Sequence, residues 1–148
     1  MTRIDPITVI DAYKWTLTHP TGSADWIYAD INGDIRCCPI VAVALYAKRV
    51  REPAIQRLAN LDGGLHSLPA FIQIICDGSG RESEALGIVR RLLDISRPYL
   101  HGFMWGYDRW PLDPYWVEPW HQDYDLGYAD GGIIREMLEL RDFKIWLA

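Results

Sequence analysis

Two adjacent cysteines, Cys37 and Cys38, stand immediately before a proline and a long apolar run. Pro39 suits the first position of a helix, and a residue that precedes proline takes the extended backbone of an N-cap. A thiol at a helix N-terminus has a lowered pKa, because the unpaired N–H groups and the helix dipole stabilise the thiolate. Cys38, or Cys37 beside it, is therefore a candidate nucleophile of a cysteine-dependent hydrolase or transferase.

Such an enzyme also needs a histidine base and a polar group that orients it. His101 and His66 are the candidate bases, since both follow the cysteines and lie in loop-like sequence. Free cysteine, however, often packs as a small hydrophobic residue, and no glycine-rich stretch adjoins the pair to supply an oxyanion site. We therefore favour structural cysteines over an enzyme and keep the catalytic interpretation as the alternative.

The most unusual stretch of the chain is an aromatic and acidic segment at about 99–130. This part of the sequence contains six acidic residues and one basic residue, Arg109, so the segment accounts for the whole net charge of −5. Rings beside carboxylates bind sugars, cationic ligands or basic peptides, and Trp and Tyr are frequent anchors of protein interfaces. The residues expected to contact a partner are Trp105, Tyr107, Trp110, Tyr115, Trp116, Trp120, Asp108, Asp113 and Glu118.

This segment predicts a small interaction protein, regulatory or inhibitory, that binds a macromolecular partner through residues 99–130. An acidic surface attracts a basic one, so we expect another protein with a basic surface as the partner. The acidic balance argues against direct nucleic-acid binding. Two further interpretations stay open: the rings line a site for a small ligand, or they pin a long loop to the domain.

No metal or cofactor is expected. Cys37 and Cys38 are adjacent and lack the spacing of zinc ligands. The stretch Asp30–Asp34 opens like a calcium loop, but Ile35 and Val41 stand where that motif needs glycine and glutamate. The predicted site residues therefore act without a bound ion.

Length and composition indicate an ordinary globular domain. The chain has 148 residues, of which 49% are hydrophobic and 24% charged, and these values suit a single domain, 1–148. No apolar run approaches the roughly 18 residues of a membrane span, and the N-terminus lacks the pattern of a signal peptide. With three cysteines and no disulfide framework, we expect reduced thiols and a cytoplasmic location. No internal repeat is evident, and the oligomeric state stays open.

The strongest structural signal is a buried helix at about 39–51. Residues 39–47 are apolar without a polar face, and a helix that is apolar all round is normally buried on all sides. Lys48, Arg49 and Arg51 follow, where cations complement the negative end of the helix dipole. We expect this helix to form the centre of the core.

The remaining elements are predicted from turn and capping signals. Asn32-Gly33 predicts a β-hairpin at about 26–37, because both residues tolerate positive φ. Further helices are expected at about 6–18, 81–96 and 130–141, with Pro98 ending the second and Asp130 capping the third. Prolines between residues 99 and 130 predict an irregular segment there. The expected fold class is α+β and mostly helical.

Overall fold

The structure is a computed structural model, and it describes residues 2–22, 27–51, 54–59, 82–111 and 121–141. Its elements are α1 (Pro6–Thr16), β1 (His19–Pro20), β2 (Ile27–Ala29), β3 (Ile35–Cys37), α2 (Pro39–Ala47), α3 (Ala54–Ala59), α5 (Glu82–Leu93), α6 (Arg97–Tyr107) and α7 (His121–Arg141). The fold is α+β and mostly helical, which confirms the predicted class. None of the described helices is long and apolar enough to cross a bilayer.

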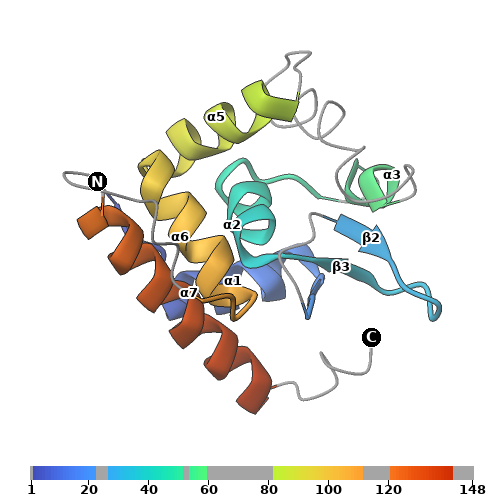
Figure 1. Cartoon of the computed structure of the whole chain (residues 1–148). Helices are drawn as coiled ribbons and strands as arrows, with labels where there is room; N and C mark the ends of the chain where they lie inside the picture. The colour runs from blue at the N-terminus through green and yellow to red at the C-terminus, as the bar shows by residue number, and fades with distance from the viewer. Residues whose placement is uncertain (1, 23–26, 52–53, 60–81, 112–120, 142–148) are drawn as a thin grey trace.

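Helix α2 lies at the centre of the fold, with α1, α5 and α6 around it (Figure 1). Cys38 is its N-cap residue and Pro39 occupies the first turn, as predicted. The helix ends earlier than expected because Arg49 adopts left-handed backbone, with φ of 52°. The N–H groups of Arg49 and Val50 then turn back to the carbonyls of the last helical turn, at 3.0 and 2.9 Å.

Strands β2 and β3 form the predicted hairpin, and they pair antiparallel from Ile27 opposite Cys37 to Ala29 opposite Ile35. Strand β1 adds in parallel to the other edge of β3, so the described strands are ordered β1-β3-β2. Within the turn of this hairpin, only Gly33 takes positive φ, at 82°, and its N–H donates to the carbonyl of Asp30. The turn therefore needs one left-handed residue rather than the two that were expected.

Asp30 organises this hairpin and joins it to β1. Its Oδ1 accepts the N–H groups of Asn32 and Asp34 at 2.9 and 3.0 Å, and its Oδ2 accepts Nε of Arg36 at 2.8 Å. The buried Arg36 also donates to the carbonyl of Pro20, in β1. The hydrogen bond from Arg36 is the main reason that the pKa of Asp30 lies below its ordinary value.

The prediction of an irregular segment at 99–130 is wrong at both ends of that segment, where α6 and α7 form. Ser96 caps α6 by accepting the N–H of Tyr99 at 3.2 Å. Pro98 lies in the first turn of the same helix, where a missing N–H costs nothing. Pro98 does not end the preceding helix as predicted, because α5 ends at Leu93, before the left-handed Asp94. Residues 112–120 lie outside the described residues.

Asp130 does not cap α7, because that helix already begins at His121. Asp130 instead lies buried within the helix, where Arg3 binds its two oxygens at 3.0 and 2.7 Å. The hydroxyl of Tyr99 donates to the same carboxylate at 2.5 Å and accepts the N–H of Ile4 at 2.8 Å. One carboxylate thus ties the N-terminal segment to both α6 and α7.

Helices α6 and α7 run side by side in the same direction (Figure 1). Their backbones touch at four glycines, two on each helix and four residues apart: Gly102, Gly106, Gly127 and Gly131. A Cβ atom on any of them would come closer than 3.0 Å to a carbonyl oxygen of the facing helix. Residues four apart share one helix face, so this spacing lets the backbones meet over a full turn.

The two helices carry the same short pattern on their facing sides. Residues 99–106 read YLHGFMWG and residues 124–131 read YDLGYADG, so both begin with tyrosine and repeat glycine at the fourth and eighth positions. The contacts are reciprocal, because Gly102 meets the backbone of Tyr124 while Gly127 meets that of Tyr99. The pair of helices α6 and α7 therefore has local twofold symmetry. Their shared sequence pattern is a short internal repeat, which the sequence did not lead us to expect.

Two neighbouring glycines of α7 give a matched test of this contact. Gly131→Ala should destabilise the protein by about 3 kcal/mol or more, because its Cβ would overlap the backbone of Phe103. Gly132→Ala should stabilise it by about 1 kcal/mol, because no atom lies within 4 Å and alanine favours the helix. Urea unfolding of both variants measures the difference. Equal effects at the two positions would show that the helices are not in backbone contact.

The hairpin gives a prediction that depends on pH. Asp30→Asn keeps an oxygen for the two turn N–H groups but loses the charge that pairs with Arg36, so the thermal midpoint at pH 7 should fall by several degrees. The depressed pKa of Asp30 means that its contribution is present above 3.8 and lost as the pH falls through the lower, folded-state value. The difference between variant and parent should therefore shrink toward zero as the pH falls below that folded-state value. Asp34→Asn, in the same turn, is the control and should have little effect.

Candidate partner-binding site

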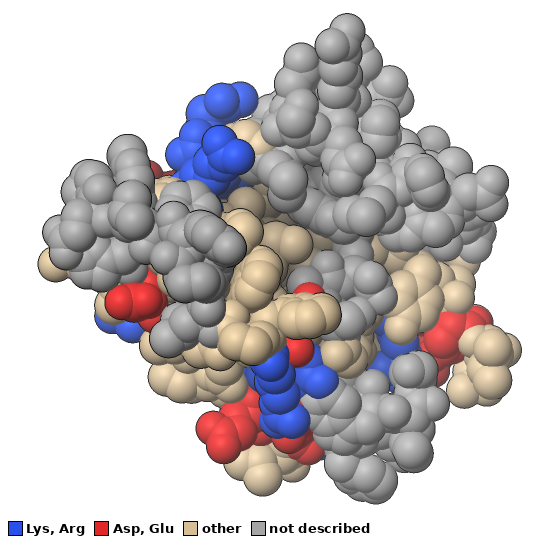
Figure 2. Space-filling view, in the orientation of Figure 1, with Lys and Arg blue, Asp and Glu red and all other residues tan. Residues whose placement is uncertain are grey.

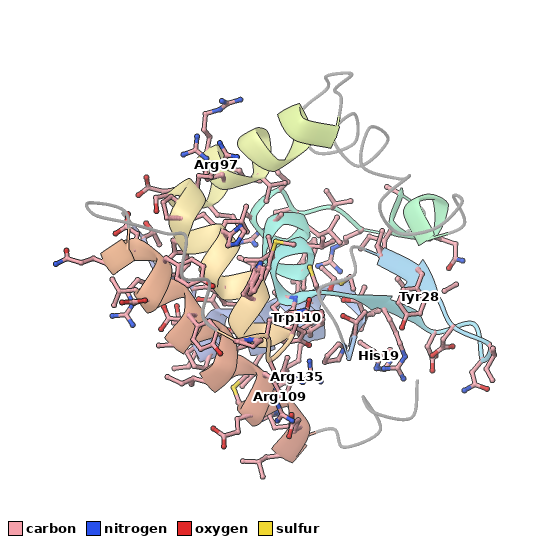
Figure 3. All side chains as sticks on the ribbon, in the orientation of Figure 1. His19, Tyr28, Arg97, Arg109, Trp110 and Arg135 are labelled. Atoms are coloured by element: carbon pink, nitrogen blue, oxygen red, sulfur yellow. The ribbon has the colours of Figure 1, made fainter. Side chains whose placement is uncertain are left out.

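Trp110 follows the end of α6 and exposes 56% of its surface (Figure 3). The backbone N–H of Trp110 donates to the carbonyl of Trp105 at 3.0 Å, and the backbone carbonyl of Trp110 accepts the hydroxyl of Tyr128 at 2.6 Å. Arg109, just before it, is left-handed with φ of 60° and donates its N–H to Gly106. These bonds form a Schellman ending, which fixes the backbone that carries the exposed indole.

A continuous set of rings extends from Trp110 across both helices. We call His101, Trp105, Trp110, Tyr124 and Tyr128 the ring cluster. Measured between ring centroids, Trp105 lies 6.0 Å from Trp110 and 5.4 Å from His101. His101 lies 5.6 Å from Tyr124, and Tyr124 lies 6.2 Å from Tyr128. Tyr124 is buried, whereas the other four members are at least partly exposed. The cluster therefore has a buried base and an accessible outer side.

Three carboxylates lie on the helix segments that carry this cluster. Asp108 ends α6, and Asp123 and Asp125 lie in the first turns of α7, all at least partly exposed. Arg109, between Asp108 and Trp110, forms an ion pair with Glu139. Over the visible face as a whole, acidic and basic side chains are interspersed (Figure 2).

Glu139 also holds a second arginine at the end of the helix pair. Arg135 donates Nε to Glu139 at 3.3 Å and a terminal nitrogen to the carbonyl of Tyr107 at 2.8 Å. Figure 3 shows Arg109 and Arg135 close together beside α7. Burial lowers the pKa of Arg135, and the carboxylate and carbonyl oxygens compensate its charge. This ion-pair group fixes the end of α6 from which Trp110 projects.

Tyr107 was expected to contact a partner, but the structure places it in the core. The side chain is fully buried, and its hydroxyl donates to the carbonyl of Thr21 at 2.5 Å. Burial is the main reason that its pKa is raised. Once α6 is known to be a helix, the reason is clear: Tyr107 continues the buried row of Tyr99 and Phe103, spaced four residues apart.

The remaining predicted residues divide into two groups. Trp105, Asp108 and Trp110 lie at or just after the C-terminal end of α6, where the centroids of the two tryptophan rings are 6.0 Å apart. The others lie outside the described residues: His66, Asp113, Tyr115, Trp116, Glu118 and Trp120. His101, proposed as a base, belongs to the ring cluster and lies in a helix rather than a loop.

The cysteines are buried at the base of α2. Cys37 is fully enclosed, and its thiol donates to the hydroxyl of Thr18 at 3.5 Å. Burial raises the pKa of this thiol far above the ordinary range, so it stays protonated at neutral pH and is a poor nucleophile. Cys38 is 4% exposed, and its side chain does not cap the helix. Both positions suit packing rather than catalysis.

Within the described ranges, no three side chains of His, Cys, Asp or Glu lie close enough to share a metal ion. One pocket was missed at the sequence level, at the ends of α1 and α2, where Trp15 and Arg51 meet. In the sequence, the only sign of this pocket is the run of cations after α2, and such cations are also expected at any helix C-terminus because they complement the helix dipole. Thirty-six positions separate the two residues, so the pocket depends on tertiary packing.

Comparison with known proteins does not identify a relative. No protein family model matches the sequence, and no curated protein or solved structure matches the chain. The functional argument therefore depends on the chemistry of the side chains, as it must whenever a fold alone is known.

Alkylation of the thiols tests their burial. In the native protein at pH 8, Cys37 and Cys38 should react with iodoacetamide about a hundredfold slower than in urea, because reaction requires opening of the core. Glu136→Cys, at an exposed position of α7, supplies a reference thiol. Peptide mass mapping separates the sites. Reaction of Cys38 at the reference rate, with a midpoint well below about pH 8.5, would restore the enzyme interpretation.

Proposed function

We propose that this chain is an interaction protein that binds another protein through the ring cluster around Trp110. The observation that carries the proposal is a half-exposed tryptophan on a fixed backbone. Tryptophan is enriched among residues that dominate binding energy, because it buries a large area in one contact. A side chain whose backbone is already ordered also loses less conformational entropy on binding.

The chemistry around Trp110 favours a basic partner surface. Asp108, Asp123 and Asp125 lie on the same two helices as the rings, and Arg109, the residue before Trp110, forms an ion pair with Glu139. Arginine and lysine side chains of a partner would gain both ring-face contacts and carboxylate contacts here. A regulatory or inhibitory role suits such a surface, since acidic surfaces speed association with basic proteins.

A purely structural role explains only part of this arrangement. In a Schellman ending, the residue after the left-handed position commonly packs on the last helical turn, as Trp110 does on Trp105. A smaller apolar side chain would satisfy that contact without leaving a large indole surface in water. The exposed remainder of Trp110 is the part that we assign to a partner.

Substitution of Trp110 tests the proposal against a control of equal exposure. Trp110→Ala should weaken partner binding about 30-fold or more, the loss typical of a central interface tryptophan. Ile133→Ala, on α7 and 55% exposed in the parent, should leave binding unchanged. Immobilised parent and variants are compared on extract from the protein's own cells by quantitative mass spectrometry. The affinity of each retained protein is then measured with purified components.

Salt dependence provides the second criterion. A basic partner should bind more weakly as salt is raised from about 0.1 to 0.5 M, because screening weakens exposed charge pairs. Equal retention of every protein by the parent and by Trp110→Ala would contradict the proposal. Binding that Ile133→Ala abolishes, and Trp110→Ala does not, would move the interface to the outer face of α7.

A further inference from the structure

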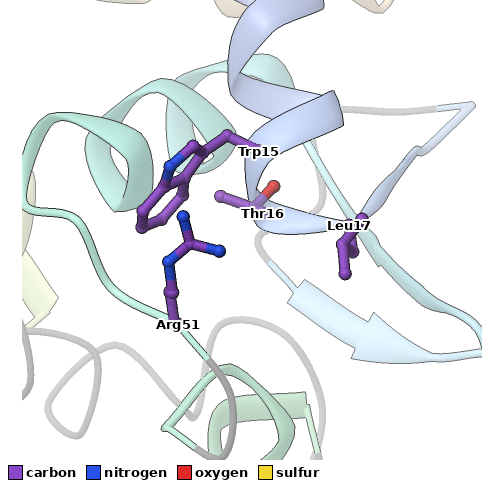
Figure 4. A pocket seen from close by; sticks show the side chains of 4 residues that line it. All are labelled: Trp15, Thr16, Leu17 and Arg51. Atoms are coloured by element: carbon purple, nitrogen blue, oxygen red, sulfur yellow. The ribbon is translucent and has the colours of Figure 1, made fainter.

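A shallow pocket lies where the C-terminal ends of α1 and α2 meet (Figure 4). Its volume is about 180 Å³, and it is lined by Trp15, Thr16, Leu17 and Arg51. It shares no residue with the ring cluster, so its function does not depend on the one proposed above. Sites that hold a whole small molecule usually measure roughly 300–1,000 Å³, so this pocket suits a single chemical group.

Aromatic rings position Arg51 in this pocket and Arg49 beside it. The guanidinium carbon of Arg51 lies 3.7 Å from the centroid of the Trp15 ring, which is a direct stacking distance. The guanidinium carbon of Arg49 lies 4.2 Å from the Tyr46 ring and 5.7 Å from Trp15. A guanidinium on a ring face keeps the N–H donors at its edges available, so stacking orients these groups without using all their donors.

Neither arginine is paired with a carboxylate in the part of the chain that the structure describes. Arg49 donates to the carbonyl of Tyr46 at 2.6 Å, and the contact of Arg51 is with the Trp15 ring. Four of the other described arginines form ion pairs, namely Arg3, Arg36, Arg109 and Arg135. Among the described residues, no carboxylate therefore compensates the charge of Arg51 in the pocket or of Arg49 beside it.

The positive charge here exceeds what the helix ends require. Lys14, Lys48, Arg49 and Arg51 are all exposed at the ends of α1 and α2. Each helix C-terminus carries about half a negative charge, so the two ends together offset about one of these four cations. Within the described residues, these four cations outnumber the exposed carboxylate of Asp11 on α1, in a chain whose net charge is −5. An excess of this kind favours an anionic ligand.

We propose that this pocket binds the terminal phosphate of a phosphate monoester. Arginine forks match phosphate oxygens and donate paired hydrogen bonds to them, and two cations suit a doubly charged group. Thr16 does not take part, because its hydroxyl already donates to the carbonyl of Ala12 at 2.7 Å. Arg51 supplies the principal donors, Arg49 adds charge, and Trp15 holds Arg51 in place.

NMR titration of the full-length protein with inorganic phosphate tests the site. The Trp15 indole N–H, assigned through Trp15→Phe, should shift with saturation at a dissociation constant on the order of 1 mM. Arg51→Gln should weaken binding about tenfold or more, because a charged paired hydrogen bond is lost. Arg91→Gln removes the same charge from an exposed position of α5 and should change the constant less than about twofold.

Further probes separate local geometry from general electrostatics and identify the source of the phosphate. Arg51→Lys keeps the charge but loses the fork, so it should also weaken binding, and it decides the question if Arg51→Gln does not fold. AMP and phosphoserine are compared with acetate, and tighter binding of either phosphate compound shows whether a nucleotide or a phosphorylated side chain is preferred. Shifts that stay linear to about 20 mM, or equal losses in Arg51→Gln and Arg91→Gln, would overturn the proposal.

Discussion

The backbone contact between α6 and α7 is the constraint on which the rest of this structure depends. Because glycines lie on the facing sides of both helices, no side chain fits between them, and the large rings are displaced to the flanks of the pair. Tyr99 and Tyr107 are fully buried on the core side, whereas Trp105 and Tyr128 remain partly exposed in the ring cluster. The same contact that stabilises the fold thus separates core rings from surface rings.

Buried hydrogen bonds then connect this helix pair to the beginning of the chain. Asp130 receives donors from Arg3 and Tyr99, and Tyr107 reaches the carbonyl of Thr21, just beyond β1. A buried polar group without a partner costs about 1–3 kcal/mol, so these hydroxyl and carboxylate groups specify one arrangement of the helices rather than merely adding attraction. The core around α2 is otherwise apolar, and apolar packing alone would tolerate several arrangements of the helices that surround it.

Both proposed sites lie at helix endings of one kind. Among the described residues, the non-glycine positions with positive φ are Leu17, Arg49, Asp94 and Arg109, and each follows the end of a helix. In every case the next N–H returns to a carbonyl five residues earlier. Left-handed backbone costs a non-glycine residue roughly 1–2 kcal/mol. At three of these endings the side chains so placed belong to a proposed site: Trp110 after Arg109, Leu17 in the lining of the pocket, and Arg49 beside it. Fixed chain reversals can thus hold a side chain in the exposed geometry that binding needs.

Local signals in the sequence were sufficient for the core helix α2, its Cys38-Pro39 start and the hairpin around Gly33, because caps, prolines and turn glycines act over a few residues. They were insufficient for α6 and α7. Glycine disfavours an isolated helix by about 1 kcal/mol per residue, and this cost is offset only when a second helix approaches that face. The burial of Tyr107, the internal position of Asp130 and the stacking of Arg51 on Trp15 likewise depend on residues distant in the chain. Tertiary packing decided them, because each is an interaction between elements and no single segment encodes it.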